Sequence, residues 1–129
     1  MKKSLKTVLA ITVAAVLIGL IFFGLNYYKS YYNYNLKLTD LAEIKSDNGL
    51  YSVMIQQVGA PKGAFADSDV RVTVKNLNGE ILHKFDSRIA NDGKRLNQYN
   101  WSVEWDKETV TIILDGEEQE AEVFTLNLE

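Results

Sequence analysis

The chain lacks cysteine and has only one histidine and one proline in its 129 residues. Without cysteine it has no disulfide, no thiol nucleophile, no cysteine metal ligand and no cysteine to carry a lipid after its leader. One histidine excludes a metal site built from several histidines. The formal net charge of −3 argues against nucleic acid as a partner. The length indicates one folded domain, and these absences leave few routes to catalysis.

Residues 7–25 form an uncharged run of 19 residues, TVLAITVAAVLIGLIFFGL. As a helix this run is about 28 Å long, close to the hydrocarbon thickness of a bilayer. Lys2, Lys3 and Lys6 precede the run and no acidic residue does, so the positive-inside rule predicts a cytoplasmic N-terminus. We therefore predict a basic cytoplasmic leader at 1–6 and a transmembrane signal-anchor helix at 7–25, crossing the cell membrane once.

A cleaved signal peptide is the alternative interpretation of this run. Signal peptides have a shorter apolar region of about 7–15 residues, followed by a cleavage site with small residues. Here the run is longer and ends in Phe22-Phe23-Gly24-Leu25, which favours an uncleaved anchor. A helix buried in a soluble core is disfavoured because the segment has no polar face.

A tyrosine-rich segment, NYYKSYYNYN, follows at residues 26–35. Tyrosine concentrates at membrane interfaces, where the ring is buried and the hydroxyl stays hydrated. We predict that Tyr27, Tyr28, Tyr31 and Tyr32 lie at the membrane interface, the alternative being an aromatic platform for glycans or bases. Their spacing is helical and predicts that the helix continues outward for two turns. Residues 36–45 fit a short helical or extended connector, so 26–45 is predicted to be an aromatic juxtamembrane connector.

From residue 46 onward, apolar side chains alternate with polar ones in short segments separated by turns. Alternation of this kind is typical of half-buried strands, and Asn78-Gly79 is a strong hairpin signal. The predicted fold of residues 46–129 is all-β, a small antiparallel β-sandwich or meander of about six strands in an extracytoplasmic domain. The six expected strands are 50–58, 69–77, 80–85, 100–106, 109–114 and 120–128.

Side-chain alternation also predicts which residues face the core. In the strand at 80–85 we expect Ile81, His83 and Phe85 to share the inner face, with a polar loop following at 88–99. From residue 26 onward the chain carries 11 basic and 17 acidic residues. A domain with this balance is repelled by anionic lipid headgroups and is not expected to lie flat on the membrane.

Several turn and strand-edge motifs resemble a known group of proteins. They are Ser46-Asp47-Asn48-Gly49-Leu50-Tyr51, Val58-Gly59-Ala60-Pro61, Ser68-Asp69-Val70-Arg71-Val72, Asn91-Asp92-Gly93, Val103-Glu104-Trp105-Asp106 and the segment from Ile113 to Gln119. These residues resemble uncharacterised small membrane-anchored proteins of Gram-positive bacteria, similar to the domain-of-unknown-function family DUF5412. The resemblance covers about two thirds of the chain. It implies an anchored extracytoplasmic β-domain and supplies no activity or site.

Loop carboxylates are the strongest candidates for a ligand site. Asp67, Asp69 and Asp92 lie in or beside loops, and Ca²⁺ binds six to eight oxygen ligands of this kind. The segment around Asp67 and Asp69 lacks the glycine and the bidentate glutamate of an EF-hand loop, so a turn-forming role is favoured. With Tyr99, the expected exposed aromatic residue, these three aspartates form the weak ligand site that the sequence predicts. No catalytic, cofactor-binding or metal-ligating residue is predicted.

Three other groups of residues each have a catalytic or binding interpretation that is weaker than a structural one. His83 lacks an orienting carboxylate, because Asp86 falls on the opposite strand face. Glycosidase chemistry needs two carboxylates in a cleft, whereas the glutamates near the last turn follow an exposed hairpin. Those glutamates are Glu117, Glu118, Glu120 and Glu122. Trp101 and Trp105 could stack on a sugar, but one face of a small sheet must be core.

The sequence thus predicts a membrane-anchored extracytoplasmic β-domain with a non-catalytic interaction or envelope-accessory role. The partners expected are the membrane and a protein of the envelope, with no nucleic acid and no cofactor. The alternative is a module that binds or senses a ligand, either calcium or a cell-wall glycan. A hydrolase that uses aspartate or glutamate is the least favoured interpretation.

Overall fold

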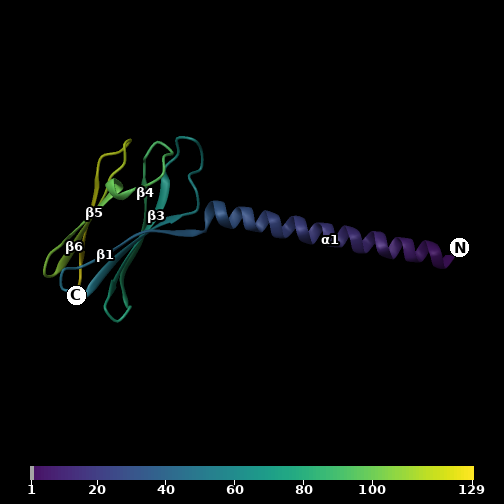
Figure 1. Cartoon of the computed structure of the whole chain (residues 1–129), viewed down its shortest axis with the longest axis horizontal. Helices are drawn as coiled ribbons and strands as arrows, with labels where there is room; N and C mark the ends of the chain where they lie inside the picture. The colour runs from purple at the N-terminus through teal and green to yellow at the C-terminus, as the bar shows by residue number, and fades with distance from the viewer. Residues whose placement is uncertain (1) are drawn as a thin grey trace.

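The computed structural model describes residues 2–129 and contains one long helix and seven strands (Figure 1). The elements are α1 (Lys2–Asn35), β1 (Leu38–Lys45), β2 (Tyr51–Val58), β3 (Ser68–Asn76), β4 (Ile81–Ile89), the 3-10 helix η1 (Gln98–Asn100), β5 (Trp101–Trp105), β6 (Thr109–Leu114) and β7 (Glu122–Asn127). Strands β1–β4 form one antiparallel sheet in chain order, and β5–β7 form a second. The fold is therefore β apart from the helix, with seven strands where the sequence predicts six.

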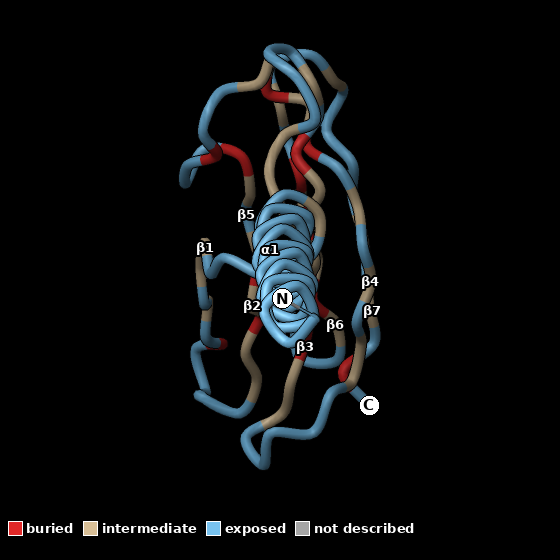
Figure 2. The backbone as a smooth tube through the Cα atoms, turned by 90° about the vertical axis from the view of Figure 1, so that its right-hand side faces the viewer, coloured by how far each residue is buried: buried red, intermediate tan, exposed pale blue. Residues whose placement is uncertain are grey.

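Helix α1 projects away from the strands (Figure 1), and its residues 2–34 are exposed (Figure 2). It is long and apolar enough to serve as a membrane anchor or a signal sequence. The helix continues past residue 25 to Asn35, which confirms the predicted extension through the tyrosine-rich segment. No β-branched run, glycine pair or proline interrupts residues 26–35, so nothing in the local sequence ends the helix earlier.

The seventh strand lies in the segment that the sequence predicts to be a helical or extended connector. Residues Leu38–Lys45 form β1, which pairs with β2 in antiparallel register. A bulge at Leu41, between Asp40 and Ala42, inserts one extra residue into the strand. The insertion breaks the two-residue alternation, which is why the pattern of apolar residues does not read as a strand. The sheet therefore begins at Leu38 and not after Ser46.

A second bulge, in β4, gives the first residues of this strand an orientation that differs from the predicted one. Val74 pairs with His83 and Lys75 pairs with Ile81, so Leu82 is the extra residue. Leu82 consequently packs against the core, whereas the side chain expected there, Ile81, is 55% exposed. Beyond the bulge the alternation is as predicted, because His83 and Phe85 are half-buried. The strand also runs four residues further than predicted, to the buried Ile89.

The two sheets share one apolar core. Its fully buried side chains are Val53, Ile55, Val70, Val72, Val74, Ile89, Val110, Ile112 and Leu114. Alternate residues of β2, β3 and β6 therefore face this core. Trp101, Val103 and Trp105 of β5 are half-buried and pack against this core. The rings of Phe85 and Phe124 join the two sheets, with centroids 4.6 Å apart.

Helix α1 is hydrogen-bonded directly to the β-domain. The Ala60 amide donates to the Tyr34 carbonyl and the Gly59 amide donates to the Lys37 carbonyl, each at 2.8 Å. Gly59 has φ +68°, and a Cβ added there would overlap the Tyr34 carbonyl. The turn after β2 thus satisfies a carbonyl that the helix end leaves free, so that the helix is docked on the domain instead of joined by a loose linker.

Candidate functional site

Three connections meet at one end of the sandwich, shown at the upper end of the domain in Figure 1. They are the loop 59–67 after β2, the long connection 90–100 between β4 and β5, and the turn 115–121 between β6 and β7. Gly93, with φ +69°, lies against the backbone of Ala64. The Glu118 amide donates to the Ala90 carbonyl at 2.9 Å. Two motifs on which the resemblance rests, at 91–93 and 113–119, are thus neighbours in space.

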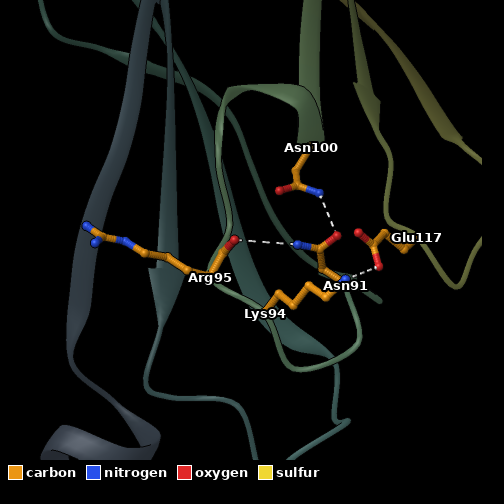
Figure 3. A network of polar contacts seen from close by, with 5 residues as sticks. All are labelled: Asn91, Lys94, Arg95, Asn100 and Glu117. Atoms are coloured by element: carbon orange, nitrogen blue, oxygen red, sulfur yellow. Dashed lines mark hydrogen bonds and ion pairs between the residues drawn. The ribbon is translucent and has the colours of Figure 1, made fainter.

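The side chain of Asn100 holds this end together (Figure 3). Its Nδ2 donates to Asn91 Oδ1 at 3.2 Å and to the Asp115 carbonyl at 2.9 Å. Its Oδ1 accepts a hydrogen bond from the Asn97 amide at 2.8 Å. Asn91 and Asn100 are buried, and a buried amide is stable only when its donors and acceptor are paired in this way. The network therefore links the β4–β5 connection to the end of β6.

An ion pair lies beside the network. Lys94 Nζ donates to Glu117 at 2.7 Å, and this hydrogen bond raises the pKa of the Lys94 amine. The Arg95 guanidinium points away from the other labelled side chains in Figure 3, whereas its carbonyl accepts from Asn91 Nδ2 at 3.5 Å. The only basic side chain that Figure 3 shows pointing into the network is thus already neutralised by an acidic one.

These residues surround an open hollow of about 560 Å³, which we call the Asn100 hollow. Its lining residues are Asn91, Lys94, Arg95, Asn97, Tyr99, Asn100, Asp115, Gly116 and Glu117. Tyr99 is 82% exposed, and its amide donates to Asn97 Oδ1 at 2.9 Å, which orders the backbone below the ring. The volume is within the range of small-molecule sites, about 300–1,000 Å³. Chemically, the hollow offers amides, one ion pair and an exposed aromatic ring.

The structure separates the residues of the predicted weak ligand site. Tyr99 belongs to the Asn100 hollow, whereas Asp67 and Asp69 line a different hollow of about 200 Å³ with Lys62 and Arg88. Asp69 lies 3.5 Å from the Arg88 guanidinium. Asp92 is in neither lining and occupies a left-handed turn with φ 55°. Within residues 2–129, no three acidic or histidine side chains are grouped so as to hold a metal ion.

His83, Asp86 and Glu122 take part in contacts between strands. His83 Nε2 lies within hydrogen-bonding distance of the Asn127 carbonyl and so joins β4 to β7. Asp86 is on the opposite face of β4, as expected, where it pairs with Arg71 at 2.8 Å. That hydrogen bond lowers the pKa of the Asp86 carboxyl. Glu122 accepts from Ser87 Oγ at 3.0 Å, which adds a second bond between β4 and β7.

The tyrosines of the predicted interface lie on the outer part of α1. Tyr27, Tyr28, Tyr31 and Tyr32 are all exposed. At 100° per residue they occupy one side of the helix, and Lys29 and Asn33 lie on the other. Their contact with a membrane interface stays a prediction.

Sequence reasoning missed the asparagines that build the hollow. Asn97 and Asn100 form a reciprocal cap on η1. The Asn97 side chain accepts a hydrogen bond from the Tyr99 amide, and the Asn100 side chain accepts one from the Asn97 amide. The available signal was a cluster of three asparagines, at positions 91, 97 and 100, in a connection too long for a simple hairpin. Their contact with Asp115 has no local signal, because it depends on how β6 packs beside the connection.

Comparison with protein-family models, curated proteins and solved structures finds no match to the chain. The resemblance to anchored proteins of unknown function therefore stays a prediction.

Proposed function

We propose that the chain is a single-pass membrane protein whose helix α1 holds the β-domain outside the cell membrane, with the N-terminus in the cytoplasm. The domain has a non-catalytic role, in which it contacts a protein of the envelope or supports an envelope assembly. The observation that carries this proposal is the docked junction between α1 and the loop after β2. A rigid junction is useful when a surface has to be presented at a fixed height and orientation, and a cleaved leader has no need of one.

The length of α1 supports this arrangement. Residues 26–35 rise about 15 Å beyond the apolar run, whereas one headgroup layer is roughly 5–8 Å thick. The tyrosines nearest the run then lie among the headgroups, and the domain begins just above them. An exposed helix of this length has no other partner within the described residues that could cover its apolar side chains.

The distribution of charge supports the same orientation. Residues 26–90, which contain the four-stranded sheet, carry eight basic and seven acidic residues. Residues 91–129, which contain the three-stranded sheet, carry three basic and ten acidic residues. Figure 1 shows the helix leaving the domain on the side of the four-stranded sheet. The acidic sheet thus faces away from the helix, where repulsion by anionic lipids is weakest.

Site-specific photo-crosslinking in the cells that produce the protein tests the interaction role. A photo-reactive amino acid replaces Ser102, exposed on β5, in the full-length chain. A matched chain carries the same group at Ser4, near the start of α1. We expect a discrete protein adduct from position 102 that is absent from position 4. Failure of position 102 and of other exposed positions on β5–β7 to form any adduct contradicts the proposal.

A second candidate function is a ligand-binding module, and the Asn100 hollow favours it. The hollow is an ordered cavity with an exposed aromatic ring, and nothing in the contact role requires one. Calcium is the less favoured ligand, because Asp67 and Asp69 share their hollow with Lys62 and Arg88, and Asp69 is already paired with Arg88. Titration with calcium checks this directly: a rise in melting temperature at millimolar calcium would restore the calcium alternative.

A further inference from the structure

We infer that the Asn100 hollow binds a neutral oligosaccharide, with Tyr99 stacking on a sugar ring. This inference rests on the second proposed function, the ligand-binding module, and names its ligand class. It does not depend on the protein-contact role, which the adduct at position 102 tests separately.

The charge of the lining favours a neutral ligand. Two basic residues, Lys94 and Arg95, are balanced by two acidic ones, Asp115 and Glu117. The Lys94 amine is already bonded to Glu117, and the Arg95 guanidinium points away from the network (Figure 3). An anionic ligand would have to compete with Glu117 for the Lys94 amine. A cationic ligand would have to displace Lys94. A ligand without charge leaves the ion pair of Lys94 and Glu117 intact and can form hydrogen bonds with the same groups.

The exposed ring of Tyr99 favours a ligand with an apolar face and polar edges. A tyrosine that is 82% exposed on an ordered backbone loses little conformational entropy when a ligand covers it. Its amide is fixed by Asn97 Oδ1, so the ring stands at a defined place on the rim. A pyranose ring presents C–H groups on its face and hydroxyls at its edge. That pattern matches an aromatic ring surrounded by amides.

The polar groups around the ring are of the kind that binds hydroxyls. Among residues 2–129, no hydrogen bond in the structure uses the Asn97 Nδ2 group or the Tyr99 hydroxyl. Asn97 Nδ2 can donate, the Tyr99 hydroxyl can donate or accept, and Glu117 retains acceptor capacity beside Lys94. The buried amides of Asn91 and Asn100 form a floor that is already paired and cannot collapse into the space. The site is therefore preformed, and its volume of about 560 Å³ lies within the range of small-molecule sites.

Binding by the full-length chain tests the inference. The protein is kept in dodecylphosphocholine micelles, because detergents with sugar headgroups would compete for the hollow. The probes are cellotriose, triacetylchitotriose and, as a neutral non-sugar, N-acetyl-trialanine amide. Calorimetry and saturation-transfer NMR measure binding by the wild type and by the variants Tyr99→Ala, Tyr99→Phe and Phe65→Ala. Phe65 is the matched control, since it is similarly exposed but lies in the loop 59–67.

We expect one of the two saccharides to bind with a Kd on the order of 0.1–1 mM, as for an open site. Tyr99→Ala should weaken that binding at least tenfold, because it removes the stacking ring. Tyr99→Phe should weaken it by no more than about threefold, because it keeps the ring and removes only one exposed hydrogen-bonding hydroxyl. Phe65→Ala should leave the binding unchanged. Affinity should be the same at 50 and 500 mM salt, because the ligand is neutral. The inference is overturned if neither saccharide binds at 10 mM, if Tyr99→Ala binds as well as the wild type, or if salt abolishes binding. Binding of the peptide alone overturns the saccharide class and leaves the ligand-binding module standing.

Discussion

Asn100 bonds three residues, Asn91, Asn97 and Asp115, through one side-chain amide, and it shows how much a single buried residue determines at the end of this sandwich. Replacing it with alanine removes three hydrogen bonds and leaves the buried Asn91 Oδ1 without its donor. We expect Asn100→Ala to lower the free energy of unfolding by about 2–4 kcal/mol. Urea unfolding followed by the fluorescence of the two tryptophans measures this value.

The control for this change is Gln98→Ala, two residues away on the exposed side of η1. It should change the free energy of unfolding by no more than about 0.5 kcal/mol. Equal effects of the two substitutions would show that the asparagine network does not stabilise this end of the domain.

Asp86 gives a prediction about pH. Its hydrogen bond with Arg71 lowers its pKa in the folded state below the ordinary value of 3.8. The stability that this pair adds is therefore fully present above that value and is lost as the pH falls through the lowered pKa. The contribution is below about 1 kcal/mol, because the Asp86 side chain is largely exposed and solvent screens the pair.

Melting temperatures of the wild type and of Asp86→Asn at pH 2 and pH 6 check the pH prediction. The wild type should be the more stable at pH 6, and the difference should shrink toward pH 2. The control Glu104→Gln removes an exposed carboxylate that forms no ion pair among residues 2–129 and should not reproduce this pattern. A difference between wild type and Asp86→Asn that is equal at both pH values would contradict the account.

At the scale of the strand, two bulges decide which side chains enter the core. Leu41 in β1 and Leu82 in β4 are both extra residues in their strands, and both pack against the core. Leu82→Ala should therefore lower the free energy of unfolding by about 1–2 kcal/mol, since the side chain is half-buried. Ile81→Ala should change it by less than about 0.5 kcal/mol, because Ile81 is exposed. The same urea titration tests both, and the reverse order would place Ile81 inside, as strict alternation predicts.

The regular strands were predictable from the sequence with their inner faces, whereas β1 and the start of β4, where the two bulges lie, were not. In β3 the residues Val70, Val72 and Val74 alternate without a break, so the sequence alone indicates both the strand and its inner face. In β1 the bulge at Leu41 shifts the pattern by one residue, and no single-sequence rule shows where a bulge will fall. Local alternation is a property of neighbouring residues, whereas a bulge is fixed by the partner strand.

The junction between α1 and the domain yields a prediction at the same scale. In Gly59→Ala the new Cβ would overlap the Tyr34 carbonyl, and the positive φ adds strain. The control is Gly79→Ala, which has φ +83° but open space around its Cβ position. In the control, the free energy of unfolding should fall by only about 1–2 kcal/mol, because alanine is strained in this backbone conformation. Gly59→Ala should lower the free energy of unfolding by more than this, and it should also loosen the attachment of α1 to the β-domain.

Spin labels on Ser30→Cys and Glu104→Cys measure that loosening in the otherwise cysteine-free chain. The distance distribution between the labels should be narrow in the parent and in Gly79→Ala, and broad in Gly59→Ala. A parent distribution as broad as that of Gly59→Ala would mean that the helix is not docked on the domain.

At the scale of the whole molecule, the sequence predicts the parts better than their arrangement. An uncharged run and alternating strands are local patterns, and they predict an apolar helix followed by an antiparallel β-domain. The docking of Gly59 on Tyr34 and the contact of Asn100 with Asp115 join residues far apart in the chain. Neither has a local signal, so the rigid junction and the Asn100 hollow become visible only in three dimensions. Of the predicted ligand residues, Tyr99 alone belongs to that hollow.

The central claim is that α1 remains attached and holds the β-domain outside the membrane, and cysteine labelling in intact cells tests it most directly. Because the natural chain has no cysteine, Ser4→Cys and Ser102→Cys each provide a single reactive site, before the apolar run and on β5. A membrane-impermeant maleimide should label Ser102→Cys in intact cells and Ser4→Cys only after permeabilisation, with both found on a full-length, membrane-bound chain. Labelling of Ser4→Cys alone in intact cells, or recovery of the β-domain as a shorter soluble chain, would contradict the account.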